Sequence, residues 1–359
     1  MSPGSRHDWV VIDGAHGEGG GQILRTALSL SVISGRPLRI DGVRALRRNP
    51  GLAAQHLTAV RAAGELCAAR LEGDLIGSTS VTFAPTKPVT AGHYVFDVGI
   101  AREGGSAGAV MLVLQTVFLP LARAAEASRV VLRGGTHMAW SPPFDYIRDV
   151  WLPMLGRCGL NAGIDLQAWG WYPIGKGEVI AEIEPGPPLL KPVQISEPGL
   201  LRRIRGRAVA ANLPAHIPQR MADRARALLA GLGAEIDIEP LQVSAACPGA
   251  GIFLTAEYAN LNCGFSALGE RGKTSERVAE EAAEALIAHH ASGAAVERHL
   301  GDQILLPLCF ADGRSVFSVE DITAHIETNA WVIESFGVAR VEVERAGPRI
   351  GQVTVTPTT

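Results

Sequence analysis

The sequence predicts an α/β (α+β) fold in which three β-α-β-α-β-β repeats form a pseudo-threefold main domain that carries a small α/β insert domain. Three observations predict this fold. Strand-like and helix-like hydrophobic patterns alternate along the chain, the same order of elements recurs, and a proline-punctuated segment of different character interrupts the series. With 359 residues, 47% of them hydrophobic, the chain can bury a sizeable core and is too long for one small domain.

The first repeat is expected in the N-terminal part of the chain. Short runs of apolar and β-branched residues predict strands, and longer, mostly apolar stretches predict helices. In order, these are a strand at 9–15, a helix at 20–34, a strand at 37–43, a helix at 52–69 and a strand at 80–86.

The second and third repeats follow the same order. The second has a strand at 94–99, a helix at 107–123, a strand at 129–135, a helix at 143–158 and strands at 162–168 and 178–183. The third begins with a helix at 296–310 and continues with a strand at 315–321, a helix at 322–336 and strands at 339–345 and 352–357. Recurrence of one unit predicts that each copy backs a sheet with two helices.

A segment at 187–294 is expected to form the inserted domain, which leaves 1–186 and 295–359 for the main domain. It opens in the proline-rich run E-P-G-P-P-L-L-K-P, and its own elements are a strand at 200–209 and helices at 218–232 and 274–290. Proline punctuation and a self-contained strand-helix-strand pattern are typical of such an insert.

Composition excludes several classes of protein. The longest apolar stretch, at 107–121, is interrupted by Gln115 and Thr116, which argues against a membrane span. Five scattered cysteines without C-x-x-C spacing fit reduced thiols and give no zinc signal. No export signal precedes the first strand, so a cytoplasmic protein is expected.

The net charge of −3 gives no general attraction for nucleic acid. Local arginine clusters at 36–48 and 202–207 would have to hold a polyanion or else face water.

The run D-G-A-H-G-E-G-G-G-Q-I-L-R-T at 13–26 is the strongest functional signal. Five glycines within eight residues lead straight into an apolar helix, which predicts a loop whose bare N–H groups bind phosphate at a helix N-terminus. A tight turn without a ligand is the alternative. The dinucleotide fingerprint fails because its third glycine position is Gln22. Gly272-Lys273-Thr274 fails as a Walker A motif because Ala267 stands at its first glycine position.

Three polar positions stand out among apolar ones. Gln115 lies inside a helix that otherwise reads as fully buried, so its amide is either satisfied within the core or binds a ligand. Asp302 opens the first helix of the third repeat, where it would suit the helix dipole or serve a site. His325 lies near the start of the last helix, and a single histidine there is structural or nucleophilic.

Together these segments resemble the RNA 3′-terminal phosphate cyclase family, collinearly from about Val11 to the C-terminus. The similar segments are G-E-G-G-G-Q-I-L-R-T, R-A-L-R-R-N-P-G-L-A-A-Q-H-L-T-A-V, L-V-L-Q-T, G-G-T-H-M-A-W-S-P-P-F-D, G-W-Y-P-I-G-K-G, H-L-G-D-Q and H-I-E-T-N. The resemblance implies a three-repeat α/β domain with a small insert. It also implies ATP-dependent conversion of an RNA 3′-phosphate to a 2′,3′-cyclic phosphate, with a divalent metal (Mg or Mn), RNA 3′-phosphate ends as partner and no obligate protein partner.

The resemblance also assigns residues. His325 matches the nucleophile that forms a histidine-AMP intermediate, and Glu18, with Asp302, matches the metal side of the site. The positions matching the adenylate and phosphate contacts are Gln115, His299, Leu300, Gly301, Asp302, Gln303, Pro142, Arg25, Arg44, Arg47 and Gln55.

Three positions depart from the family pattern. The connection before L-V-L-Q-T is long and contains Arg102 and Glu103, which would affect either access of the RNA end or substrate preference. Lys176 replaces a glycine usual in the G-W-Y-P-x-G-x-G turn. His299 stands where an aromatic ring often stacks on adenine, and an imidazole offers less stacking area.

Two other functions are compatible with parts of the pattern. A non-catalytic RNA-binding or ribosome-assembly relative on the same fold would lack the histidine of H-I-E-T-N, which is present. An enolpyruvyl transferase uses similar repeats on small phosphorylated substrates, but it would need neither His325 nor H-L-G-D-Q.

Overall fold

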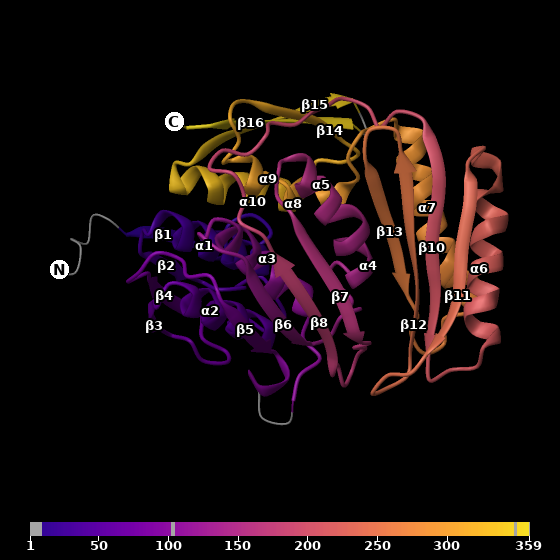
Figure 1. The fold of residues 1–359 in the computed structure, drawn as a ribbon, viewed down its shortest axis with the longest axis horizontal. Helices are drawn as coiled ribbons and strands as arrows, with labels where there is room; N and C mark the ends of the chain where they lie inside the picture. The colour runs from indigo at the N-terminus through magenta and orange to yellow at the C-terminus, as the bar shows by residue number, and fades with distance from the viewer. Residues whose placement is uncertain (1–8, 102–104, 348–349, 359) are drawn as a thin grey trace.

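The computed structural model describes residues 9–101, 105–347 and 350–358. They form a mixed α/β fold with four four-stranded sheets (Figure 1). Three of these sheets surround a central group of helices, and the fourth stands at one end of the molecule. None of the described helices is long and apolar enough to cross a membrane.

The first sheet has the order β1-β2-β4-β3. In β1 the buried Val10 and Ile12 alternate with the exposed Val11 and Asp13, so one face of the strand packs on the core. The elements of this unit are β1 (Val10–Asp13), α1 (Gly21–Ser34), β2 (Leu38–Asp41), α2 (Ala54–Leu66), β3 (Arg70–Glu72) and β4 (Ser80–Ala84). The first two strands are parallel, and the other pairs are antiparallel.

The second sheet repeats this plan in the order β5-β6-β8-β7. Its strands are β5 (His93–Asp97), β6 (Ser128–Gly134), β7 (Ala162–Ala168) and β8 (Gly177–Ile183). Helix α3 (Val110–Ala122) follows β5. The predicted helix at 143–158 consists of α4 (Phe144–Tyr146), a π-helical turn (Ile147–Trp151) and α5 (Leu152–Arg157).

The third sheet has the order β15-β16-β14-β9 and the same pairing pattern. Its elements are β9 (Gln194–Ile195), α8 (Arg298–Gln303), α9 (Leu305–Leu308), β14 (Ser315–Val319), α10 (Ala324–Phe336), β15 (Ala339–Gly347) and β16 (Ile350–Pro357). Strand β9 was not predicted, because only two of its residues pair, far along the chain from their partner β14. The prediction of one helix at 296–310 was wrong, since the structure has α8 and α9 there.

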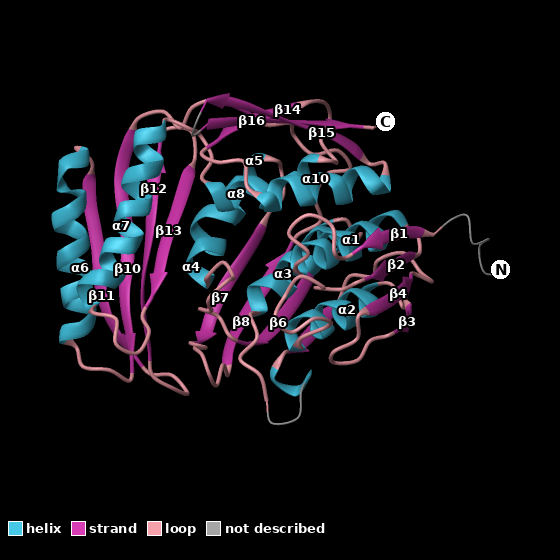
Figure 2. Ribbon diagram, turned by 180° about the vertical axis from the view of Figure 1, so that it is seen from behind, coloured by secondary structure: helices cyan, strands magenta, loops and turns pink. Residues whose placement is uncertain are grey.

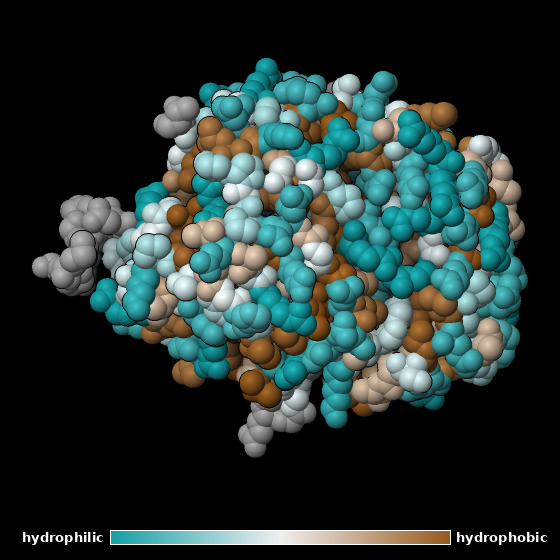
Figure 3. Space-filling model, in the orientation of Figure 1, coloured by the Kyte–Doolittle hydropathy of each residue, from teal (hydrophilic) through white to brown (hydrophobic). Residues whose placement is uncertain are grey.

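The fourth sheet belongs to the segment between β9 and α8. Its elements are β10 (Leu201–Ala211), α6 (His216–Leu229), β11 (Glu235–Val243), β12 (Gly249–Tyr258), β13 (Asn262–Leu268) and α7 (Ser275–Ser292), with strand order β11-β10-β12-β13. Helices α6 and α7 pack together and are linked by ion pairs such as Arg220–Glu276 and Arg224–Glu280. The opposite face of this segment, shown in Figure 3, is also mostly hydrophilic. The predicted domain boundary at 187 stays a prediction, and β9 lies after it.

The central helices explain where the site lies. Helix α1 packs against α2, α3 and α10, which gather between the first three sheets (Figure 2). Every residue of α3 is buried except Gln115, which is half-buried. The apolar helix therefore fixes one amide at the junction of three units.

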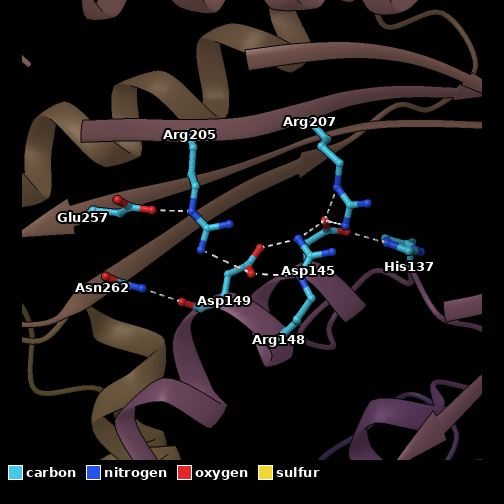
Figure 4. A network of polar contacts seen from close by, with 8 residues as sticks. All are labelled: His137, Asp145, Arg148, Asp149, Arg205, Arg207, Glu257 and Asn262. Carbon is cyan, nitrogen blue, oxygen red and sulfur yellow. Dashed lines mark hydrogen bonds and ion pairs between the residues drawn. The ribbon is translucent and has the colours of Figure 1, made fainter. Parts of the chain in front are cut away.

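An ion network joins the fourth sheet to the second unit (Figure 4). From β10, Arg207 pairs with the buried Asp145, while Arg205 pairs with Asp149 at 3.3 Å and with Glu257. Asp145 Oδ2 also lies 2.9 Å from the ring nitrogen Nε2 of His137. Two arginines of the cluster at 202–207, Arg205 and Arg207, therefore contact the second unit, whereas Arg203 pairs with carboxylates of the fourth sheet itself.

Candidate active site

The glycine-rich loop between β1 and α1 depends on its glycines for close packing. Gly17 and Gly19 both have a left-handed backbone with φ of 57°, a region that residues with a Cβ rarely adopt. A Cβ on Gly17 would lie 2.2 Å from Thr328 Oγ1 in α10. A Cβ on Gly21 would lie 2.4 Å from His56 Nε2 in α2. The glycines therefore let the loop approach both α2 and α10.

Glu18 projects from this loop and meets side chains from two other segments. Its backbone N–H donates to Thr328 Oγ1 at 3.1 Å. Its Oε2 pairs with the Arg47 guanidinium and lies 3.7 Å from His325 Nε2. Its Oε1 is buried and has no hydrogen-bond partner within the part of the chain that the structure describes. Such a carboxylate oxygen fits a divalent cation, because Mg²⁺ and similar ions prefer oxygen ligands.

His325 is the second residue of α10 and is held by the cap of that helix. The Thr323 hydroxyl accepts a hydrogen bond from a backbone N–H of the first turn at 3.3 Å. The His325 side chain is 47% exposed. Partial burial lowers the pKa of His325, Glu18 opposes this shift, and the positive charges of Arg25 and Arg47 reinforce it. An accessible, neutral imidazole is a competent nucleophile near pH 7.

A cavity adjoins this cluster between α1, α3, α8 and α10. Gln115 and Gln303 both line it, and Gln115 Nε2 donates to Gln303 Oε1 at 2.6 Å. Arg25 and Asp302 line it as well. Burial lowers the pKa of Arg25 to about 10, opposed by the negative charges of Asp302 and Glu18. Burial also raises the pKa of Asp302 to about 7. A cation or a hydrogen-bond donor bound here would favour the charged form of this carboxyl.

The segment His299–Gln303 forms most of α8, and a buried glutamate positions it. Glu297 caps the helix, because its carboxylate accepts from His299 N at 2.6 Å and from Leu300 N at 2.8 Å. The Tyr146 hydroxyl also donates to Glu297 Oε1. At the other end, Asn329 Nδ2 of α10 donates to the Asp302 carbonyl at 2.8 Å. Leu300 and Gly301 are buried, and Gly301 packs against α10.

Arg44 lies between β2 and α2, and Gln55 is the second residue of α2. Arg44 has a left-handed backbone with φ of 54°, and its Nη1 donates to the Gly51 carbonyl at 2.8 Å. Gln55 Oε1 accepts from Ala109 N at 2.9 Å, at the start of α3. The amide oxygen of Gln55 is therefore engaged within the protein, and its NH₂ group is the part suited to a phosphate.

His56 is a residue of this cluster to which the sequence alone assigned no role. Burial lowers its pKa to about 3, and the charges of Arg25, Arg44 and Arg47 contribute. Its Nδ1 is buried without a hydrogen-bond partner among the described residues. A neutral ring nitrogen without a partner, beside three arginines, is suited to form a hydrogen bond with a ligand. In the sequence, the only hint of this role for His56 was its place after Gln55 in an arginine-rich segment.

Some of the predicted residues lie elsewhere or cannot be placed. Pro142 is part of the loop before α4 and is not among the residues that line the cavity. Arg102 and Glu103 lie outside the described residues. Within residues 9–101, 105–347 and 350–358, no group of three or more His, Cys, Asp or Glu side chains is placed to hold a metal ion by itself. A divalent cation at this site would therefore need ligands beyond such side chains.

Comparison with known proteins identifies the relatives of this chain. The family model described as RNA 3′-terminal phosphate cyclase matches residues 16–343. A protein of that name from Methylococcus capsulatus is 58% identical over 344 residues, which cover 96% of this chain and 95% of the relative. Those from Gloeothece citriformis (52% over 332 residues, 92% and 95%) and Methanopyrus kandleri (42% over 355 residues, 97% and 99%) are also similar.

A solved structure also matches, at a low level. The enolpyruvyl transferase NikO from Streptomyces tendae is 16% identical, with a TM-score of 0.25, and the match covers 60% of this chain and 37% of that one. A likeness this weak carries no argument about function.

Proposed function

The chain belongs to the RNA 3′-terminal phosphate cyclase family, and on that premise we propose that it uses ATP to convert an RNA 3′-phosphate to a 2′,3′-cyclic phosphate through a histidine-AMP intermediate on His325. The observation that carries this proposal is the position of His325. Its half-exposed imidazole lies 3.7 Å from Glu18 and within the field of Arg25 and Arg47. A nucleophile, a carboxylate and two cations thus converge where a triphosphate would react.

In the first step, a ring nitrogen of His325 attacks the α-phosphorus of ATP. A nitrogen–phosphorus bond forms, the bond to the bridging oxygen breaks, and pyrophosphate leaves with the electron pair. Arg25 and Arg47 face the oxygens on which negative charge develops, and guanidinium groups bind such oxygens in a fork geometry. A divalent cation held by Glu18, with Asp302, would supply further charge stabilisation when bound.

In the second and third steps, AMP passes to the RNA and is then released. An oxygen of the RNA 3′-phosphate attacks the histidine-bound phosphorus, and the nitrogen–phosphorus bond breaks. The 2′-hydroxyl then attacks the phosphorus of the 3′-phosphate, loses its proton and expels AMP. Because this closure is intramolecular, proximity supplies much of its rate. A terminal deoxyribose lacks this 2′-hydroxyl, so RNA rather than DNA ends should cyclise.

The remaining site residues fit the same scheme. Arg44 and the Gln55 NH₂ group are proposed to bind the RNA 3′-phosphate beside His56. Gln115 and His299–Gln303 are proposed to hold the adenylate, with Pro142 beside the adenine. The hydrogen bond between Gln115 and Gln303 supports this assignment, because it brings the two amides close together. In the same scheme, the three similar sheets are repeats of a pseudo-threefold main domain, and 187–294 is its insert.

The test is covalent labelling with α-labelled ATP and magnesium in the absence of RNA. The wild type is expected to acquire a label that is acid-labile and alkali-stable, and His325→Ala is expected to acquire none. His290→Ala, in α7 of the insert, is the matched control and should label normally. Full labelling or cyclisation by His325→Ala would refute the assigned nucleophile. Absence of label in the wild type with ATP binding intact would favour a non-catalytic RNA-binding protein.

A further inference from the structure

Two loops of the second unit hold exposed side chains in costly backbone conformations. Trp140, in the loop after β6, is 99% exposed and has φ of 63°. Lys176, in the loop between β7 and β8, is exposed and has φ of 54°. Bulky and long side chains rarely adopt left-handed backbone, and such strain tends to gather at functional sites. In the same turn as Lys176, Tyr172 is 76% exposed.

The two loops are joined and rest on a rigid aromatic base. The Gly170 carbonyl accepts from Thr136 N at 2.9 Å and from His137 N at 3.1 Å. The buried His137 ring stacks on Trp169 and Trp171, with ring centroids 4.5 and 5.1 Å away. The exposed side chains therefore project from an ordered support.

Both loops contact the segment 107–109, which also bonds the side chain of Gln55. Ala109 N donates to Gln55 Oε1 at 2.9 Å, and Gly135 N donates to the neighbouring Gly108 carbonyl at 2.9 Å. A Cβ on Gly175, next to Lys176, would lie 2.9 Å from the Cα of Ala107. One continuous stretch of backbone contacts thus leads from Gln55 to both loops.

We propose that Trp140, Tyr172 and Lys176 form a contact surface for the single-stranded RNA nucleotides on the 5′ side of the terminal phosphate. This inference rests on the proposed function, because it assumes that an RNA end enters beside Gln55. Exposed aromatic rings with a nearby cation are the combination that binds single strands: bases stack on the rings, and the cation meets the backbone. The surface would favour longer RNA over a bare terminal nucleotide.

Glycine substitutions test the surface without endangering the fold. Trp140→Gly and Lys176→Gly each remove an exposed side chain and relieve the left-handed backbone, so both variants should fold at least as well as the wild type. Ala68→Gly is the matched control, because Ala68 is exposed with φ of 47° but offers neither a ring nor a charge. Fluorescence anisotropy would measure the affinity for two 3′-phosphorylated RNA probes, a longer single strand read directly and a nucleoside 3′-phosphate read by competition.

The expected result is a loss confined to the longer RNA. Trp140→Gly should weaken its binding by roughly 5- to 150-fold, which corresponds to one stacked base, and leave binding of the nucleoside 3′-phosphate unaffected. Lys176→Gly should reduce the slope of log affinity against log salt by about 0.7. Ala68→Gly should match the wild type.

Three results would overturn the inference. These are equal wild-type affinity for the two probes, unchanged binding of the longer RNA by both variants, or a wild-type dimer in sedimentation that Trp140→Gly abolishes. Labelling with ATP in the absence of RNA distinguishes failure of this inference from failure of the proposed function. If the wild type and both variants form enzyme-AMP, their active sites are intact, and any change in RNA affinity comes from the proposed contact surface.

Discussion

Replacing Gly17 with alanine should damage the site more than the fold. Gly17 has φ of 57°, and its Cβ would lie 2.2 Å from Thr328 Oγ1. That oxygen accepts the backbone N–H of Glu18 at 3.1 Å. Gly35 provides a matched control, because it has φ of 69° and a Cβ added there would meet nothing within 4 Å. Both substitutions place an alanine in left-handed backbone, but only Gly17→Ala brings its Cβ into a steric clash.

The magnitudes follow from these distances. Left-handed backbone costs an L-residue about 1–2 kcal/mol, which is the expected destabilisation for Gly35→Ala. Gly17→Ala also loses the hydrogen bond to Thr328, for a combined cost of about 1.5–3.5 kcal/mol. To reach an ordinary contact of 3.4 Å, the loop or Thr328 must move by about 1 Å. A displacement of this size at a reacting group slows catalysis on the order of 100-fold.

The assay compares the rate of enzyme-AMP formation with the urea midpoint for both variants. Gly17→Ala should label on the order of 100-fold more slowly than the wild type, whereas Gly35→Ala should label at the wild-type rate despite its lower stability. Equal labelling rates for the two variants would refute the argument that Gly17 is required to bring Glu18 and His325 together.

Three further predictions concern groups around the site. Tyr146→Phe removes one hydrogen-bond donor from the buried carboxylate of Glu297, which caps α8. It should destabilise the protein by about 1.5–3 kcal/mol and raise the KM for ATP. An unchanged urea midpoint and an unchanged KM would contradict this role. Burial and nearby arginines lower the pKa of His56 to about 3, below its unfolded value, so stability should fall as pH drops below about 6.5; His56→Asn should lessen the fall between about pH 7 and about pH 5, measured by urea unfolding. Asp145→Ala removes a buried carboxylate that contacts His137 and Arg207, and it should destabilise the protein by about 3–5 kcal/mol. Glu235→Ala, which removes an exposed carboxylate, should cost under about 1 kcal/mol. Similar urea midpoints for both variants would show that the network of Figure 4 does not stabilise the contact with the fourth sheet.

Local sequence was sufficient for most of the elements and for their order. The strand patterns at 37–43 and 80–86 became β2 and β4, and the apolar stretch at 107–123 became α3. It gave no range for β3, for β9 or for the strands β11, β12 and β13 of the fourth sheet. A strand as short as the two-residue β9 leaves no periodic signal. The break between α8 and α9 was missed because the apolar pattern runs through it.

The residues of the candidate site could be named from the sequence, but their arrangement in space could not. The resemblance named Glu18, Arg47 and His325, which lie in three separate segments, and no local pattern gives the 3.7 Å between Glu18 and His325. His56 went unassigned because its significance depends on burial beside arginines that are distant in sequence. The sequence alone could not decide whether the arginines of β10 bind RNA, face water or pair with carboxylates. The structure pairs Arg205 and Arg207 with carboxylates.

By itself, the sequence determined the recurring units, the glycine loop and the residue types available for phosphate chemistry, because periodicity and backbone freedom are local properties. The tertiary structure decided which of those residues share a site and in what state of charge. It brings the glycine loop against α10, shifts the pKa of Asp302 to about 7 by burial, and pairs Arg207 with Asp145 rather than with a ligand. Distances and desolvation arise only when segments far apart in the chain pack together.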